Sequence, residues 1–202
     1  MDLFSQLTDD QVNEMHVRSI DGLSYYPEVI THDEERSLIA HIDCSDWIHD
    51  LSRRVQHYGY RYDYRARSLD STSSLGPMPG WITELGEKLC RKGVLPFSPA
   101  QAIVNEYQPG QGIAPHIDCE PCFGSTIASL SLASAIVMDF RHAESALAVP
   151  ILLQRRSLVI MSGPARYDWS HSIAARKSDG FNGQKLCRER RLSITFRTVL
   201  FG

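Results

Sequence analysis

A seven-residue run near the end of the chain, Arg-Leu-Ser-Ile-Thr-Phe-Arg at 191–197, constrains the fold more than any other segment. Successive residues of a strand point to opposite faces, so this run places apolar Leu192, Ile194 and Phe196 on one face. The other face carries Arg191, Ser193, Thr195 and Arg197. Burying two arginines is costly unless an anion meets them, and a guanidinium pairs with a carboxylate through two hydrogen bonds. The run therefore predicts either an anion-binding strand or an edge strand with a solvated polar face.

Two histidines and an aspartate form a second pattern, His116-Ile117-Asp118 followed later by His171. In a strand, His116 and Asp118 project to the same face and can bind one ion, whereas His171 must arrive from another strand. Two histidines and one carboxylate hold Fe(II) on one face and leave other positions open for a co-substrate and O₂. An isolated His-x-Asp pair favours a buried histidine bonded to a carboxylate, but His171 and the arginine run together reverse that preference and favour the metal site.

The rest of the chain predicts helices first and strands afterwards. Thr31 followed by Asp33-Glu34-Glu35 is typical of a helix start, and a second helix is expected over 81–92 after a loop at 68–80. Strands are predicted at 101–107, 126–133, 135–141, 147–153, 157–161, 170–174 and 191–200. This order predicts an α+β, mainly β fold, with a double-stranded β-helix (jelly-roll) core buttressed by N-terminal helices. We expect residues 1–20 to be a loosely attached extension and 21–202 to be one domain.

Composition agrees with a single domain of 202 residues and 22.8 kDa. No apolar run has the length of a membrane span, and the polar N-terminus is not typical of a signal peptide. The five cysteines are an odd number without a regular framework, which predicts reduced thiols in the cytoplasm, or the nucleus of a eukaryote. We interpret Cys119-x-x-Cys122 as a chance pair rather than a zinc or redox motif. Nothing in the sequence requires more than a monomer.

Residues 53–67 carry five arginines and four tyrosines. Arginine neutralises phosphates and tyrosine stacks on bases, so this mixture indicates contact with DNA or RNA. The candidate contacts are Arg53, Arg54, Arg61, Tyr60 and Tyr62. The alternative is a solvated hairpin whose tyrosines pack on the core.

Taken together, these motifs resemble the AlkB family of Fe(II)- and 2-oxoglutarate-dependent dioxygenases. Asn105-Glu106-Tyr107-Gln108-Pro109-Gly110 begins eleven residues before His116, as in the family pattern, and the likeness covers about residues 20 to 200. Ser193 departs from the pattern, which usually has Asn there. The resemblance implies that residues 50–80 form a lid over a flipped base, and that O₂ is consumed. It further implies Fe(II) bound by His116, Asp118 and His171, with 2-oxoglutarate bound by Asn105, Tyr107, Arg191, Ser193, Thr195 and Arg197.

The resemblance leaves the substrate divided between two branches. Glu120 occupies a position where family members that repair alkylated bases carry a carboxylate. We therefore expect oxidative demethylation of bases such as 1-methyladenine and 3-methylcytosine in DNA or RNA, releasing formaldehyde, succinate and CO₂. The runs 54–60, 108–113 and 136–140 instead resemble the branch that hydroxylates a modified wobble uridine in tRNA. A third alternative is a non-catalytic nucleic-acid-binding protein.

Overall fold

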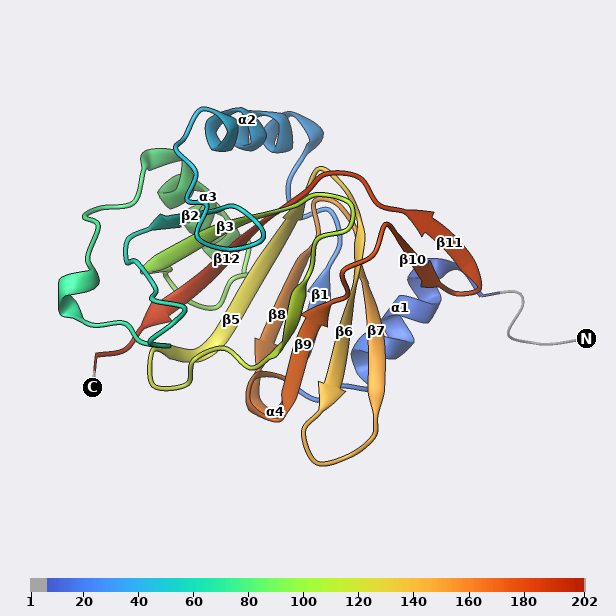
Figure 1. The fold of residues 1–202 in the computed structure, drawn as a ribbon. Helices are drawn as coiled ribbons and strands as arrows, with labels where there is room; N and C mark the ends of the chain where they lie inside the picture. The colour runs from blue at the N-terminus through green and yellow to red at the C-terminus, as the bar shows by residue number, and fades with distance from the viewer. Residues whose placement is uncertain (1–6, 202) are drawn as a thin grey trace, which may run out of the picture.

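The computed structural model describes residues 7–201, and two antiparallel sheets face each other across its core (Figure 1). The larger sheet runs in the order β1 (Leu23–Tyr26), β8 (Leu158–Ser162), β5 (Phe123–Leu132), β12 (Arg191–Val199), β3 (Gln101–Tyr107), β2 (Val55–Tyr58). The smaller sheet runs in the order β4 (Ile113–His116), β9 (Trp169–Ile173), β6 (Ile136–His142), β7 (Ala148–Leu153). A separate hairpin consists of β10 (Ser178–Phe181) and β11 (Gln184–Cys187). The mainly β jelly-roll prediction is confirmed.

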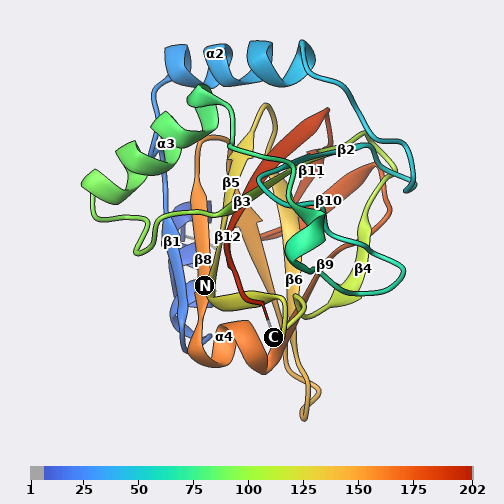
Figure 2. The same ribbon diagram turned by 90° about the vertical axis from the view of Figure 1, so that its left-hand side faces the viewer.

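Two helices, α2 (His32–Asp43) and α3 (Gly80–Arg91), cover the outer face of the larger sheet (Figure 2). The predicted start of α2 is confirmed, because Thr31 Oγ1 accepts from the Glu34 N–H while the Glu34 side chain accepts from the Thr31 N–H. The helices pack on the apolar face of β12, where Leu192, Ile194 and Phe196 are fully buried. The polar face of β12 therefore faces the space between the two sheets.

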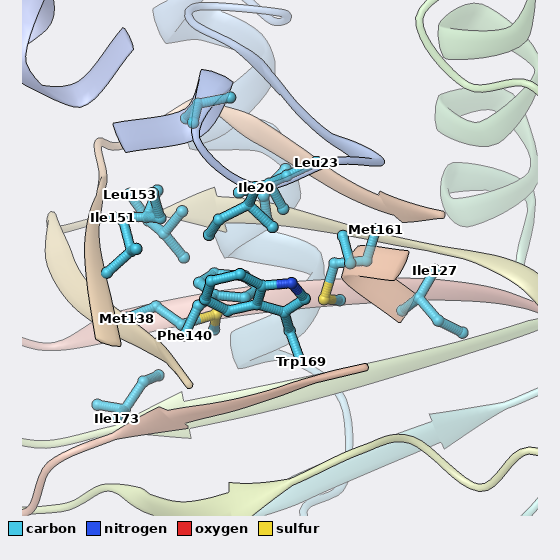
Figure 3. Packing of buried hydrophobic residues seen from close by; sticks show 14 of the residues in the cluster. Ile20, Leu23, Ile127, Met138, Phe140, Ile151, Leu153, Met161, Trp169 and Ile173 are labelled. Carbon is cyan, nitrogen blue, oxygen red and sulfur yellow. The ribbon is translucent and has the colours of Figure 1, made fainter. Parts of the chain in front are cut away.

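Apolar side chains from both sheets fill the remainder of the space between them. Figure 3 shows the rings of Phe140 and Trp169 from the smaller sheet together with Met161 and Ile127 from the larger one. Phe140 and Ile127 are inaccessible to solvent. This core fixes the separation of the two sheets, and therefore the geometry of whatever lies between them.

The N-terminal helix α1 (Asp9–Arg18) is docked on the smaller sheet. Asn13 is buried, and its amide donates to the Leu152 carbonyl at 3.0 Å while its oxygen accepts from the Leu152 N–H at 2.7 Å. These bonds pair backbone groups that β7, an edge strand, would otherwise expose. The prediction of a loose attachment is therefore wrong for α1, and residues 1–6 of the expected extension lie outside the described residues.

Two details of the strands differ from the predictions. β12 pairs with β3 on one side and β5 on the other, so the alternative of a solvated edge strand is wrong. β4 ends at His116, which leaves Asp118 in the loop that follows rather than in the strand. The loop at 68–80 is confirmed apart from a single turn, η2 (Ser71–Ser73). A short helix, α4 (Gly163–Tyr167), precedes β9.

Within residues 7–201, no helix has both the length and the apolar character required to cross a membrane.

Candidate functional site

A pocket of about 410 Å³ lies between the sheets, against the polar face of β12. Alternation along β12 sends its arginines, serine and threonine into the pocket because the other face is occupied by helix packing. Antiparallel pairing with β3 brings Asn105 opposite Ser193 and Tyr107 opposite Arg191. Eleven residues expected at a site line this pocket: Arg53, Tyr62, Asn105, Tyr107, His116, Asp118, His171, Arg191, Ser193, Thr195 and Arg197.

The two histidines meet because β4 and β9 pair with His116 directly opposite His171. Their ring centroids are 4.3 Å apart. His116 Nδ1 lies 2.9 Å from the Ala114 carbonyl oxygen, and this contact requires Nδ1 to carry the proton. The neutral ring then leaves Nε2 as an unprotonated nitrogen, which is the form that binds a metal.

Burial keeps both rings neutral. Desolvation and the neighbouring His116 lower the pKa of His171 to about 3, and desolvation likewise lowers the pKa of His116. Burial acts in the opposite direction on Asp118, but Arg197 and the two histidines outweigh it and lower the pKa of that carboxyl to about 2. At neutral pH the three side chains therefore present two neutral imidazoles and one carboxylate.

Asp118 is held from two sides. Arg197 Nη2 donates to Oδ1 at 2.9 Å, and Arg166, buried behind the loop, donates to the backbone carbonyls of Asp118 and Cys119 at 2.9 and 3.3 Å. Oδ2 is buried and has no hydrogen-bond partner in residues 7–201. No three His, Cys, Asp or Glu side chains in that range already converge as a complete ligand group. The carboxylate oxygen without a partner is nevertheless what a cation entering beside the histidines would satisfy.

Arg191 forms a second polar centre in the same pocket. It is almost fully buried, its Nη2 donates to Ser131 Oγ at 2.8 Å, and its guanidinium carbon lies 5.4 Å from the centre of the Tyr107 ring. Its Nε has no partner in the described chain, and desolvation lowers its pKa to about 10. A buried cation with no carboxylate partner is costly, so this part of the pocket suits an anionic ligand.

The residues expected to contact nucleic acid divide into two groups. Arg53 and Tyr62 line the pocket, whereas Arg54, Arg61, Tyr60 and Glu120 do not. Arg54 pairs with Glu106 and lies 4.3 Å from the centre of the Trp47 ring, while Arg61 is exposed beside Asp50. Tyr60 packs on Phe201. Glu120 is exposed on the loop after Asp118, so the structure does not bring it to the pocket.

Sequence reasoning missed other residues of the pocket wall. Tyr64 and Arg67 of the segment that we predict to form a lid (residues 50–80, called the lid below) line it, as does Phe123 at the start of β5. A signal for Tyr64 was present, because Tyr60, Tyr62 and Tyr64 alternate with exposed Arg61 and Asp63. Tyr62 and Tyr64 face the pocket and pack edge to face with centroids 5.1 Å apart, whereas Tyr60 packs on Phe201 outside the pocket lining.

The cysteine prediction requires a correction beside this site. Cys119 and Cys122 form a disulfide, with Cα atoms 5.3 Å apart, so the expectation of reduced thiols is wrong for this pair. The chain turns sharply after Asp118, and the Cys122 N–H donates to the Cys119 carbonyl. This turn brings the two side chains together. Cys44, Cys90 and Cys187 are free thiols.

Comparison with known proteins agrees with this geometry. Residues 45–197 match the model of the 2OG-Fe(II) oxygenase superfamily. The tRNA (carboxymethyluridine(34)-5-O)-methyltransferase ALKBH8 of Macaca fascicularis is 40% identical over 169 residues, covering 78% of this chain and 25% of that protein. The alkylated DNA repair protein ALKBH8 homolog of Arabidopsis thaliana is 35% identical over 216 residues, covering 96% and 61%.

A solved structure is similar in fold. The structure of OsALKBH1 superposes with a TM-score of 0.68 at 16% identity, covering 88% of this chain and 98% of that one. The chain spans only about a quarter to a third of the length of the first ALKBH8 relatives that it matches. Its likeness to them therefore concerns one part of those proteins.

Proposed function

Because this chain belongs to the 2OG-Fe(II) oxygenase superfamily and, within it, to the AlkB family, we propose that it hydroxylates a modified uridine at the wobble position of tRNA. The family consists of Fe(II)- and 2-oxoglutarate-dependent dioxygenases. The observation that carries the oxygenase chemistry of this proposal is the pocket itself, in which a histidine pair, a carboxylate and buried arginines lie beside the aromatic rings of Tyr62 and Tyr64.

The side chains present suit the family's metal and co-substrate. His116 and His171 are neutral, and Asp118 retains an oxygen without a partner, so these three residues would hold Fe(II). Arg191 beside Tyr107 would hold the distal carboxylate of 2-oxoglutarate. Asn105, Ser193, Thr195 and Arg197 would surround the rest of that molecule. With O₂, the bound pair supplies the oxidation of an inert C–H bond, and 2-oxoglutarate leaves as succinate and CO₂.

The protein's own contribution is placement and exclusion of water. Arg197 fixes the carboxylate of Asp118 from one side, and Arg166 fixes the loop backbone from the other. Tyr62 and Tyr64 provide ring surfaces on which a flipped base can stack. Ile103, Met138 and Val159 form the apolar part of the wall. A base held against this wall would present its substituent to the metal side of the pocket.

The substrate assignment rests on two observations. Relatives at 35–40% identity carry the name ALKBH8, and those of Macaca fascicularis, Xenopus tropicalis and Mus musculus are named for carboxymethyluridine 34 of tRNA. The residue that favoured repair, Glu120, is exposed and outside the pocket lining. Demethylation of 1-methyladenine or 3-methylcytosine remains the second candidate, since the Arabidopsis relative is named for alkylated DNA repair.

The test is turnover of defined substrates followed by mass spectrometry. The chain with Fe(II), 2-oxoglutarate and O₂ is incubated with anticodon stem-loops carrying a carboxymethyluridine-type base, and separately with DNA and RNA containing 1-methyladenine or 3-methylcytosine. We expect the uridine to gain one oxygen atom with stoichiometric succinate. Loss of the methyl group from the purine or cytosine, with the uridine unchanged, would assign the protein to repair instead. An Asp118→Asn variant provides the inactive control.

A further inference from the structure

Arg53 differs from its neighbour Arg54 although both begin the same lid segment. Arg54 is neutralised by Glu106, with Nε 2.5 Å and Nη2 2.8 Å from the two carboxylate oxygens. Arg53 has no carboxylate partner within residues 7–201, and only 7% of its surface is exposed. It lines the pocket that we assign to the substrate. A largely buried guanidinium that faces a pocket without a counter-charge suits an anionic or strongly accepting ligand.

The orientation of Arg53 leaves its forked end available. Nε donates to Asn105 Oδ1 at 3.0 Å, whereas neither terminal nitrogen has a hydrogen-bond partner in the described chain. The guanidinium carbon lies 5.8 Å from the ring centre of Tyr107 and 6.0 Å from that of Tyr64. The side chain is therefore fixed between the co-substrate wall and the lid, with its two terminal nitrogens unused.

The pocket lining would keep an excess of positive charge when Fe(II) and 2-oxoglutarate are bound. The charged lining residues, histidines aside, are Arg53, Arg67, Arg191 and Arg197 against Asp118 alone. Fe(II) and the two carboxylates of 2-oxoglutarate cancel one another, so they leave this excess of positive charge unchanged. Arg197 already faces Asp118, Arg191 is assigned to the co-substrate, and Arg67 is exposed at the rim. Arg53 is the buried cation that remains for the substrate.

We propose that Arg53 is a specificity-determining residue that recognises a carboxyl-derived side chain on the substrate base, such as a carboxymethyl group or its ester. The terminal nitrogens match the two oxygens of such a group, and a phosphate of the RNA backbone would not need a cation this deeply buried. This assignment rests on the proposed function of the same pocket. It adds the chemical feature by which that pocket distinguishes one modified uridine from another.

The test compares three anticodon stem-loops that differ only in the wobble base: 5-carboxymethyluridine, its methyl ester and 5-methyluridine. Equilibrium binding is measured to the Fe(II)- and 2-oxoglutarate-loaded protein without oxygen, so that the result does not depend on turnover. The variants are Arg53→Met, which removes the cation, and Arg53→Lys, which keeps the charge but loses the fork. Arg36→Met, an exposed residue paired with Asp33 on α2, is the matched control.

We expect the native protein and Arg36→Met to bind the two carboxyl-derived bases at least about tenfold more tightly than 5-methyluridine. Arg53→Met should abolish this preference and leave 5-methyluridine binding within about threefold, while Arg53→Lys retains part of the preference for the acid. Equal weakening of all three stem-loops, or a loss of preference explained by weaker binding of 2-oxoglutarate to the variant, would overturn the proposal. A native protein that binds with the preference but oxidises none of the three would refute the proposed function while leaving Arg53 assigned.

Discussion

Arg197 donates through Nη2 to Oδ1 of Asp118 at 2.9 Å, while the other oxygen of that buried carboxylate has no partner in the part of the chain that the structure describes. The arginine ends the polar row of β12 and the aspartate follows β4, so the contact joins the two sheets. Oδ1 of Asp118 is thus held by the arginine, and Oδ2 is available to bind a metal ion. One ion pair thereby connects β12, where we propose that 2-oxoglutarate binds, with the loop that carries the proposed metal ligand Asp118.

Replacing Arg197 with Met should make stability depend on metal. The change leaves the Asp118 carboxylate buried without its cation, which costs about 3 kcal/mol in the metal-free protein. A divalent cation supplies the missing charge, so Mn(II) should raise the melting temperature of Arg197→Met more than that of the native chain. Thermal unfolding with and without Mn(II) measures this difference. Equal shifts in both proteins would contradict it, and Arg18→Met, an exposed helix residue, is the control.

Replacing Asp118 with Asn should weaken metal binding by at least about tenfold, because a neutral amide replaces the only acidic residue of the pocket lining in the described chain. Isothermal titration with Mn(II) measures the affinity. Glu120→Gln provides the matched control, since it removes an exposed acid two residues away. We expect unchanged affinity there, and a comparable loss in both variants would show that general negative charge, rather than coordination, attracts the ion.

Replacing Arg191 with Lys should raise the KM for 2-oxoglutarate by about tenfold or more. The guanidinium lies in a confined space between Ser131 and Tyr107, and a lysine amine cannot donate two parallel hydrogen bonds to a carboxylate from there. Succinate production at varied 2-oxoglutarate measures the KM. Arg190→Lys is the neighbouring control, since Arg190 pairs with Glu106 and Asp43 outside the pocket lining. The same KM change in both variants would contradict the proposal that Arg191 binds the distal carboxylate of 2-oxoglutarate.

The sequence was most informative where side-chain alternation and burial coincide. The alternation along β12 predicts the environment of each of its side chains. Its apolar face packs under the helices, so its polar face lines the pocket. The histidine pair followed from the need to bring His171 to His116, although only the structure shows that the two are in register. Lid residues could not be ranked in this way. Arg53, Arg54 and Arg61 are chemically identical, and only their tertiary partners decide which one reaches the pocket. The prediction that Glu120 contacts the substrate has no support in the pocket lining for a similar reason, because the position of a residue in a loop does not determine where its side chain points.

His57 should make the lid sensitive to acid. Its Nδ1 accepts from the Tyr62 N–H at 3.1 Å, and burial, assisted by Arg61 and Arg197, lowers its pKa to about 4. The unfolded chain, with the ordinary value of about 6.5, binds the proton first as the pH falls. The contribution of His57 to stability is therefore complete above about pH 6.5 and is lost progressively towards pH 4. Between about pH 7 and pH 5 this loss amounts to about 1–2 kcal/mol.

The His57→Asn variant isolates that contribution. Its side-chain oxygen can accept the same backbone hydrogen bond but does not titrate in this range. We expect the free energy of unfolding of the native chain to fall more steeply between about pH 7 and pH 5 than that of the variant. Urea denaturation at both pH values measures the two slopes. Parallel slopes would mean that protonation of His57 is not linked to folding, and that the acid sensitivity of the chain resides in its other histidines and carboxylates.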